Sequence, residues 1–299
     1  MDRKVKVSGF TFVRDAIRLD YPIVESIKSA LPIVDEYVVN VGDCTDNTME
    51  AIRNIDDPKI KVIETEWNPD RFVAGATNAD QTNIALEHCT NPWCLYLQAD
   101  EVIHEEDFGR ITGAMEKYDS REDVDGLLFH YNHFWGSYSR VHRGHNWYDR
   151  EIRVIKNGRG IRSWKSAQSF RKNGEKLRVA DCGAWIYHYG WVRHPEVMRK
   201  KQIALDSLHH DEEWVKKRHE DPGKPWDYGP LDGIPLFRDT HPAVMQERIQ
   251  NKSWKAEVYT DPGNPPDHEH LRLWCRFHSF LEKLIGRKIG GYSNWVLVD

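Results

Sequence analysis

The sequence lacks the features that mark secreted, membrane-spanning and nucleic-acid-binding proteins. Its five cysteines include no CxxC pair and no regular spacing, so we expect reduced thiols and a cytoplasmic protein. No apolar run reaches the roughly 20 residues that cross a bilayer, and the opening MDRKVKVSGF has no signal-peptide core. The 42 basic residues are balanced by 47 acidic ones, which gives no bulk attraction to nucleic acid.

Two phosphate-binding motifs are also missing. The segment GFTFVRD, which follows the start of the first expected strand, contains no GxGxxG, and GxxxxGK[ST] occurs nowhere. This argues against a dinucleotide-dependent dehydrogenase and against a P-loop enzyme. The phosphate groups of a ligand would need another neutralising partner, and a divalent cation held by carboxylates is the obvious one.

The first 130 residues alternate between two hydrophobic periods. Segments 5–13, 36–42, 59–67 and 92–99 read as strands, and helix-length segments separate them. The pattern predicts an α/β fold, Rossmann-like, with a mainly parallel sheet flanked by helices. Ligands of such sheets bind just past the carboxyl ends of the strands.

Two adjacent carboxylates, Asp100 and Glu101, follow the fourth expected strand directly. We therefore expect Asp100 at the edge of the ligand crevice. Because neighbours on an extended chain point to opposite faces, we expect Glu101 to orient nearby polar groups and not to bind a metal. The alternative is a solvated strand end.

Further elements are expected along the chain. Apolar residues at helical spacing predict a helix over 14–31, and Asn157-Gly158 suggests a hairpin within 150–164. Residues 180–192 read as an aromatic strand, and a charged helix is expected over 195–217. The histidines of 130–149 fit no recognised zinc motif, and its aromatic residues suit packing or stacking on an acceptor.

The last expected helix, 270–287, is amphipathic. We expect its apolar face to pack on the preceding domain, and a helix lying on a membrane is the alternative. We therefore predict a domain over 1–200 and a C-terminal extension of helices and loops over 201–299. The face consists of Leu271, Trp274, Phe277, Leu281 and Leu284.

The order of several short motifs resembles the family 2 glycosyltransferases. DCTDNT follows the second expected strand, QTNIAL lies in the next helix, and LQADE ends the fourth strand. RVIKNG and HYG resemble later segments of that family. The resemblance implies a GT-A fold and transfer of a hexose-like sugar from a UDP- or GDP-sugar to a hydroxyl of a glycan, lipid or protein acceptor. It leaves room for peripheral membrane contact.

The resemblance also implies site residues. Asp100 matches the family's metal-binding Asp, for Mn²⁺ or Mg²⁺, and Gln98 stands where the first Asp of D-x-D is usual. An amide oxygen can still accept a hydrogen bond from a ribose hydroxyl. Residues proposed to contact the donor are Thr11, Arg14, Asp43, Asn78, Asn83, Gln98 and Asp100, and His188 is a second metal-ligand candidate whose alternative is a hydrogen-bonded core residue.

An inverting transferase also needs a base for the acceptor hydroxyl. The segment SWKSAQSF offers no carboxylate, so the nearby candidates are Asp149, Glu151 and Asp181, with Asp149 ranked first because it ends the aromatic segment. Two other functions stay open from sequence: a non-catalytic sugar-nucleotide or glycan-binding module, and a metal-dependent phosphohydrolase using Asp100 and His188.

Overall fold

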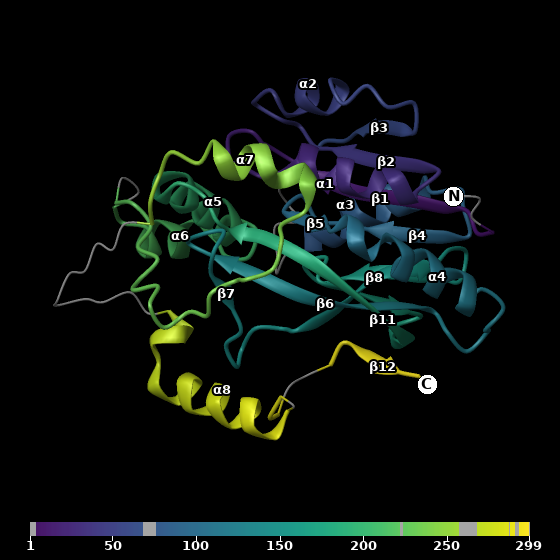
Figure 1. The fold of residues 1–299 in the computed structure, drawn as a ribbon. Coiled ribbons are helices and arrows are strands. Elements are labelled where there is room, and N and C mark those ends of the chain that lie inside the picture. Colours follow the sequence, from purple (N-terminus) through teal and green to yellow (C-terminus); the bar gives the residue numbers. More distant parts are fainter. Residues whose placement is uncertain are drawn as a thin grey trace.

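The centre of the molecule is a 12-stranded sheet with the order β3-β2-β1-β4-β8-β6-β11-β10-β9 along its main path. Figure 1 shows the part of this path from β3 to β11. β12 and β5 pair with β11, and β7 pairs with β6. The computed structural model describes residues 4–67, 76–221, 224–256, 268–286, 288–290 and 293–298. The strands are β1 (Val7–Val13), β2 (Glu36–Val41), β3 (Ile60–Glu64), β4 (Trp93–Tyr96), β5 (Glu101–Ile103), β6 (Gly126–Trp135), β7 (Val141–His142), β8 (Arg150–Lys156), β9 (Ile161–Trp164), β10 (Ser169–Lys172), β11 (Glu175–Trp191) and β12 (Trp295–Leu297).

The amino-terminal half of the sheet is parallel, as the alternating periods predict. β1 pairs in parallel with β2 and β4, and β2 pairs in parallel with β3. Every residue of β2 and β4 is buried, which is typical of parallel strands covered on both faces. The four strand predictions are confirmed.

The second half of the sheet is mixed, and it corrects the expected hairpin. β8 lies antiparallel between β4 and β6, whereas β9 pairs with β10. The turn at Asn157-Gly158 is present, with Gly158 at φ 70°, but the strands on its two sides join different neighbours. All of β8 after Arg150 is buried, so its apolar side chains favour the sheet interior over a two-stranded ribbon.

Helices cover the sheet and the carboxyl ends of its strands. α1 packs on β5, and α3 packs on β1, β2 and β9. The α-helices are α1 (Ile23–Ala30), α2 (Thr48–Arg53), α3 (Ala76–Glu87), α4 (Phe108–Tyr118), α5 (Pro195–Ser207), α6 (Glu212–Arg218), α7 (Gln246–Gln250) and α8 (Leu273–Ile285), and short 3₁₀ helices are η1 (Leu31–Ile33), η3 (Glu105–Asp107), η4 (Ala243–Met245) and η5 (Glu269–Leu271).

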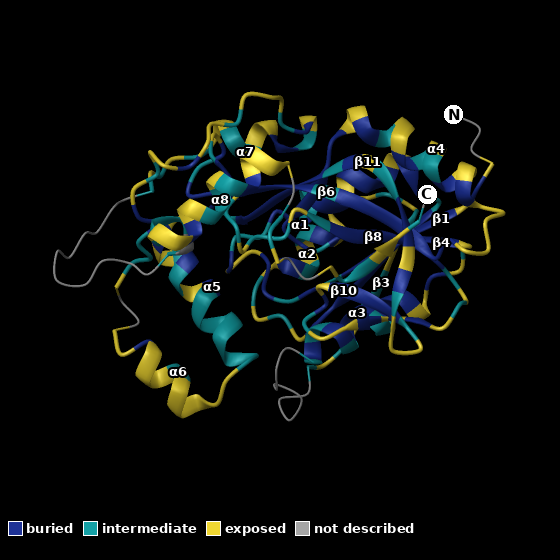
Figure 2. Cartoon of the chain, turned by 90° about the horizontal axis from the view of Figure 1, so that it is seen from below, coloured by how far each residue is buried: buried dark blue, intermediate teal, exposed yellow. Residues whose placement is uncertain are grey.

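Two helix predictions were too long. The helix expected over 14–31 begins only at Ile23, because Asp15 and Asp20 have positive φ angles of 52° and 53°. The helix expected over 195–217 is two helices, because the Asp211 side chain accepts a hydrogen bond from the Trp214 amide and starts α6. α6 is exposed along most of its length (Figure 2).

The expected packing of the last helix is wrong. α8 is present, but Phe277 and Leu284 are 58% and 67% exposed, and the buried positions are Cys275 and Glu282. Polar contacts through Glu282 and Ser279 hold the helix to the loop at His145, so the apolar face points away from the domain. Arg287, at the end of the expected helix, lies outside the described residues.

The carboxyl-terminal third returns to the main sheet. β12 pairs in parallel with β11, and α5 runs across residue 200. The division into 1–200 and 201–299 stays a prediction. Among the described residues, no helix has the length and apolar character to span a bilayer.

Candidate active site

A cleft of about 860 Å³ opens past the carboxyl ends of β1, β4, β6 and β11. Its volume lies within the range of small-molecule sites, about 300–1,000 Å³. α5 forms one wall, so the site combines strand ends with a helix from late in the chain. The side chains that form the site include Phe12, Arg14, Trp67, Asn78, Gln98, Asp100, His133, His188, Lys201 and the rings near Trp135.

Asp100 lies on the floor of this cleft. Its side chain is 8% exposed, and its Oδ2 is 3.1 Å from the Lys201 ammonium, while His188 Nε2 is 3.7 Å from Oδ1. Burial alone would raise the pKa of Asp100, but the positive charge of Lys201 first, and then that of Arg193, hold it well below the ordinary value. Asp100 is therefore ionised at neutral pH.

His188 is held so that one ring nitrogen faces Asp100. Its Nδ1 lies 2.9 Å from His133 Nδ1, and His133 Nε2 lies 2.8 Å from the Tyr148 carbonyl oxygen. The two histidines are register partners on β11 and β6. Burial lowers the pKa of both rings, so His188 is neutral and its lone pair is available to a ligand.

The pair of Asp100 and His188 fits a divalent cation. Two ligands of one Mn²⁺ or Mg²⁺ ion, each at about 2.1 Å, can be up to about 4.2 Å apart, and Asp100 Oδ1 and His188 Nε2 are 3.7 Å apart. The hydrogen bond that His188 Nδ1–H donates to His133 Nδ1 orients the ring as ligand histidines require. Lys201 occupies only the other carboxylate oxygen, Oδ2.

Gln98 borders the cleft beside Asp100, as the resemblance implies. Its amide nitrogen donates to the Ala167 carbonyl at 3.3 Å. This bond orients the side chain and leaves the amide oxygen as its hydrogen-bond acceptor.

Glu101 points away from the cleft and is fully buried. Both of its carboxylate oxygens accept hydrogen bonds from the Arg153 guanidinium at 2.7 Å, and Tyr131 donates to Oε1 at 2.9 Å. The backbone N–H of Gln98 donates to Glu101 Oε2 at 3.1 Å. The expectation that Glu101 orients neighbouring groups is confirmed, and it fixes the turn that carries Asp100.

Lys201 and Arg193 bring positive charge to the floor of the site, and neither was predicted from the sequence. Each donates to the carbonyl oxygen of Gly190, Lys201 at 2.7 Å. Burial, with Arg193 nearby, lowers the pKa of the Lys201 ammonium. A usable signal existed: Lys201 stands three residues after the buried Met198, on the same helix face.

One end of the cleft is flat and aromatic. Trp67 lies 6.1 Å from Phe12 between ring centroids, and the Arg14 guanidinium lies 5.3 Å from the Trp67 ring. Arg14 also forms an ion pair with Asp43 at 2.8 Å, and Asp43 accepts from the Trp67 amide at 3.2 Å. Asp43 thus supports this end from outside the cleft.

The other donor candidates divide into two groups. Asn78 borders the cleft. Thr11 is buried within β1 and its hydroxyl donates to the Phe12 carbonyl at 3.4 Å, while Asn83 accepts from the Ser163 amide at 2.8 Å. The structure does not bring Thr11 or Asn83 to the cleft.

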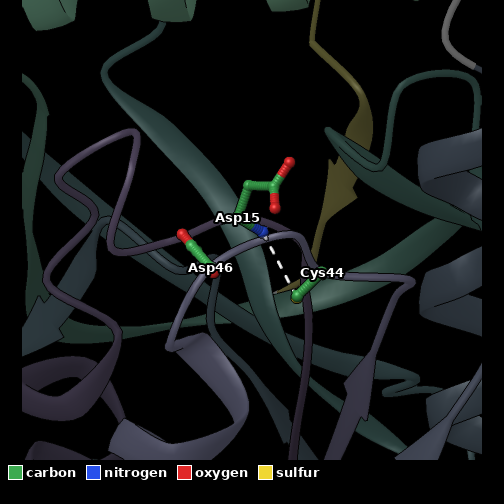
Figure 3. A group of neighbouring side chains, drawn as sticks. All are labelled: Asp15, Cys44 and Asp46. Atoms are coloured by element: carbon green, nitrogen blue, oxygen red, sulfur yellow. Dashed lines mark hydrogen bonds between the residues drawn. The ribbon is translucent and has the colours of Figure 1, made fainter.

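Asp15, Cys44 and Asp46 form a compact cluster at the turns after β1 and β2 (Figure 3). The Asp15 amide donates to Cys44 Sγ at 3.4 Å, and Asp15 Oδ1 accepts from the Thr45 amide at 2.7 Å. Asp46 accepts from the Arg18 amide at 2.7 Å. These bonds explain why DCTDNT comes directly after the strand: its polar side chains close two turns and start α2.

Comparison with known proteins identifies the family to which the chain belongs. The model of the family described as "Glycosyl transferase family 2" matches residues 21–182, more than half of the chain. The chain belongs to glycosyl transferase family 2. It is a glycosyltransferase, and its sheet and cleft form a GT-A fold.

Solved structures resemble the chain more distantly. TarS 1–349 from S. aureus matches at 12% identity over 71% of this chain and 68% of that one, with a TM-score of 0.41. A mannosyltransferase from Pyrobaculum calidifontis, in complex with GDP-Man and Mn²⁺, matches at 20% identity over 42% of this chain and 35% of that one, with a TM-score of 0.33. No curated protein sequence matches. Similarities of this extent assign no ligand to the chain.

The three carboxylates proposed as the base of this family 2 enzyme lie outside the cleft. Asp149 is exposed, Glu151 is buried and accepts from Asn294 at 2.8 Å, and Asp181 accepts from the Gly183 amide at 2.8 Å. Burial raises the pKa of Glu151, and His130 lowers that of Asp181. The ranking of Asp149 first gains no support from this geometry.

A second aromatic part of the cleft wall is built from tryptophan and histidine rings. Trp135 lies 5.1 Å from Trp191 in a stacked arrangement and 5.5 Å from His270. Both ring nitrogens of His270 have no hydrogen-bond partner among the described residues. Burial lowers the pKa of His270 to about 4, so the ring is neutral. The rings of this part of the wall are Trp135, His142, Trp147, Trp191, Trp226, His268 and His270.

Proposed function

We propose that this family 2 enzyme transfers a sugar from a UDP- or GDP-sugar to an acceptor hydroxyl bound in the cleft. The observation that carries the proposal is the ionised Asp100 on the cleft floor, flanked by a neutral His188 and by Lys201. A carboxylate, an oriented imidazole and an ammonium together suit a diphosphate and its cation.

The donor lies along the cleft with its base at the aromatic end. Trp67 and Phe12 offer flat faces for a base, and Arg14 lies against the Trp67 ring. Gln98, which borders the cleft two residues before Asp100 in the chain, offers its amide oxygen to a ribose hydroxyl. Asn78 borders the same part of the cleft.

The leaving diphosphate lies above the charged floor. Asp100 and His188 would hold Mn²⁺ or Mg²⁺, which supplies positive charge to diphosphate oxygens. Lys201, whose ammonium is fixed between Asp100 and the Gly190 carbonyl, adds a second positive group there. Charges that are already in place cost little reorganisation as the glycosidic bond breaks.

The acceptor lies beside the tryptophan and histidine rings. Its hydroxyl oxygen forms the bond to the anomeric carbon while the bond from that carbon to the diphosphate breaks, in a single inverting displacement. The acceptor proton must leave at the same time, and we propose that a ring nitrogen of the neutral His270 accepts it, because these nitrogens have no hydrogen-bond partner among the described residues.

Family membership argues against a phosphohydrolase.

We also propose a cytoplasmic location, since all five cysteines, which lie in the described part of the chain, are free thiols.

A thermal-shift screen of nucleoside diphosphate sugars, with Mn²⁺ and with chelator, tests the donor. A bound donor raises the melting temperature by mass action, and the best donor should then release its nucleoside diphosphate on incubation. A shift without release would leave a sugar-nucleotide-binding module. No shift with any donor would contradict the proposal.

A further inference from the structure

α8 presents an apolar surface that nothing in the described part of the chain covers. Leu273 is 80% exposed, and Phe277 and Phe280 are each 58% exposed. Leu284 and Ile285 are 67% and 52% exposed. At about 3.6 residues per turn, Leu273, Phe277, Phe280 and Leu284 form one continuous stripe along the helix.

The opposite face of α8 is the one attached to the protein, through the buried Cys275, a ring contact of 5.6 Å between Trp274 and His145, and polar contacts. Glu282 Oε1 lies 2.6 Å from His145 Nδ1 and accepts from the Ile289 amide at 2.9 Å. Ser279 accepts from the His145 amide at 3.0 Å. The attached face therefore fixes the direction of the stripe, whose side chains are exposed. The helix itself lies at the edge of the molecule (Figure 1).

The charge around the stripe has one sign. Arg276 and Lys283 are exposed beside it, and Arg272 precedes the helix. The single acid of α8, Glu282, is turned inward and lies 3.5 Å from Lys288. The outward half of the helix therefore combines large apolar side chains with cations, although the chain as a whole has a formal charge of -5.

We propose that α8 docks this enzyme on an anionic lipid bilayer, with the stripe inserted among the headgroups and Arg276 and Lys283 at the lipid phosphates. An apolar stripe bordered by basic residues is the pattern of helices that lie in the bilayer interface. Pairing with the same face of a second copy would bring the like charges of Arg276 and Lys283 together, so the bilayer is the better match.

The position of α8 determines which part of the cleft the bilayer would lie near. The loop that holds α8 continues from His145 into Asn146 and Trp147, which border the part of the cleft proposed for the acceptor. A bilayer under α8 would therefore lie near that part of the cleft.

Vesicle sedimentation of the full chain tests the proposal. One set of vesicles is phosphatidylcholine alone, and the other contains one-third phosphatidylglycerol. We expect binding to the anionic vesicles, and at least about tenfold weaker binding to the neutral ones, because each basic residue near an anionic surface strengthens binding several-fold.

Variants separate the stripe from its charges. Phe277→Ser with Phe280→Ser should abolish binding to both vesicles, whereas Leu236→Ser, at a site that is also 54% exposed, should not. Arg276→Gln with Lys283→Gln should remove the anionic preference, whereas Lys200→Gln with Lys217→Gln, at two exposed lysines elsewhere, should keep it.

Three results would overturn the proposal. The first is equal binding by the parent and the Phe277→Ser, Phe280→Ser variant. The second is no binding to either vesicle. The third is a dimer in sedimentation velocity that this variant dissociates while vesicles leave the parent unbound. All three are independent of transferase activity, so they do not bear on the proposed reaction.

Discussion

The carboxyl group of Asp100 is the residue on which most of the proposed chemistry depends. Asp100→Asn keeps the shape of the side chain and an oxygen for Lys201 but removes the negative charge. We expect turnover of the donor to fall by about two to three orders of magnitude, as for loss of one electrostatic stabiliser. Asp123→Asn, at an exposed ion pair with Arg121, is the control and should keep parental turnover. Equal turnover of Asp100→Asn and the parent would show that the carboxylate is only structural.

The neighbouring carboxyl group of Glu101 should behave differently, since it acts on stability. Glu101→Gln leaves the Arg153 guanidinium, itself fully buried, without a counter-charge. Breaking such a pair costs about 3–5 kcal/mol of unfolding free energy. Glu122→Gln breaks the exposed pair with Arg159 and should cost less than about 1 kcal/mol. Urea unfolding of both variants measures the difference, and similar midpoints would contradict it.

At the scale of elements, the end of β11 positions the site through Gly190. A Cβ at this position would lie 2.9 Å from Asp100 Oδ2 and would also collide with the His188 ring. Displacement of reacting groups by about 1 Å costs about 10²-fold in rate, and we expect Gly190→Ala to lose activity to about that extent. Gly109→Ala is a matched control in α4, where a Cβ meets nothing within 4 Å. Circular dichroism should show both variants folded, and an active Gly190→Ala would contradict the geometry.

The sequence predicted the sheet better than the connections within it. The four parallel strands are apolar runs that alternate with helices, and this local signal survives because both faces are buried. The prediction of a hairpin around Asn157-Gly158 was wrong. The sequence signal covers only the turn, whereas the strands that pair with β8 are β4 and β6, which are distant in sequence. The prediction that α8 packs on the domain was wrong, because periodicity identifies an apolar face but does not identify the surface that covers it.

Site residues at the end of a strand could be predicted from the sequence, whereas those contributed by distant elements could not. Asp100 and Gln98 could be placed because they lie directly after β4. Helical spacing distinguishes Lys201 from Lys200, but it does not identify the partner of Lys201, Asp100, which is 101 residues away. The neutral state of His188 depends on burial and on the nearby cations Lys201 and Arg193, which a single sequence does not encode locally.

At the scale of the whole molecule, acid should destabilise the fold in two stages. Burial lowers the pKa of His142 from 6.5 to about 3. Between pH 6.5 and about pH 3, His142 is therefore protonated in the unfolded chain and neutral in the folded one. Burial would raise the pKa of Glu36, but hydrogen bonds from Lys61, Ser8 and Thr90 hold it at about 2, below the ordinary 4.5. Both contributions to stability are present above about pH 6.5 and decline as pH falls, at up to about 1.4 kcal/mol per pH unit for each group.

Urea midpoints measured across this pH range check the prediction. We expect the decline between about pH 6.5 and 5 to be smaller in His142→Gln than in the parent, and the decline below about pH 4.5 to be smaller in Glu36→Gln. A midpoint that stays constant from neutral pH to about pH 4 would contradict the buried, neutral state of His142.

The central claim is that the cleft holds a nucleoside diphosphate through a cation at Asp100 and His188. Isothermal titration of UDP and GDP into the full chain, with Mn²⁺ and with chelator, tests it most directly. The account predicts that one of the two binds at least about tenfold more tightly with Mn²⁺, and that Asp100→Asn and His188→Ala remove this difference. The same affinity with chelator and with Mn²⁺, or no binding of either nucleotide, would contradict it.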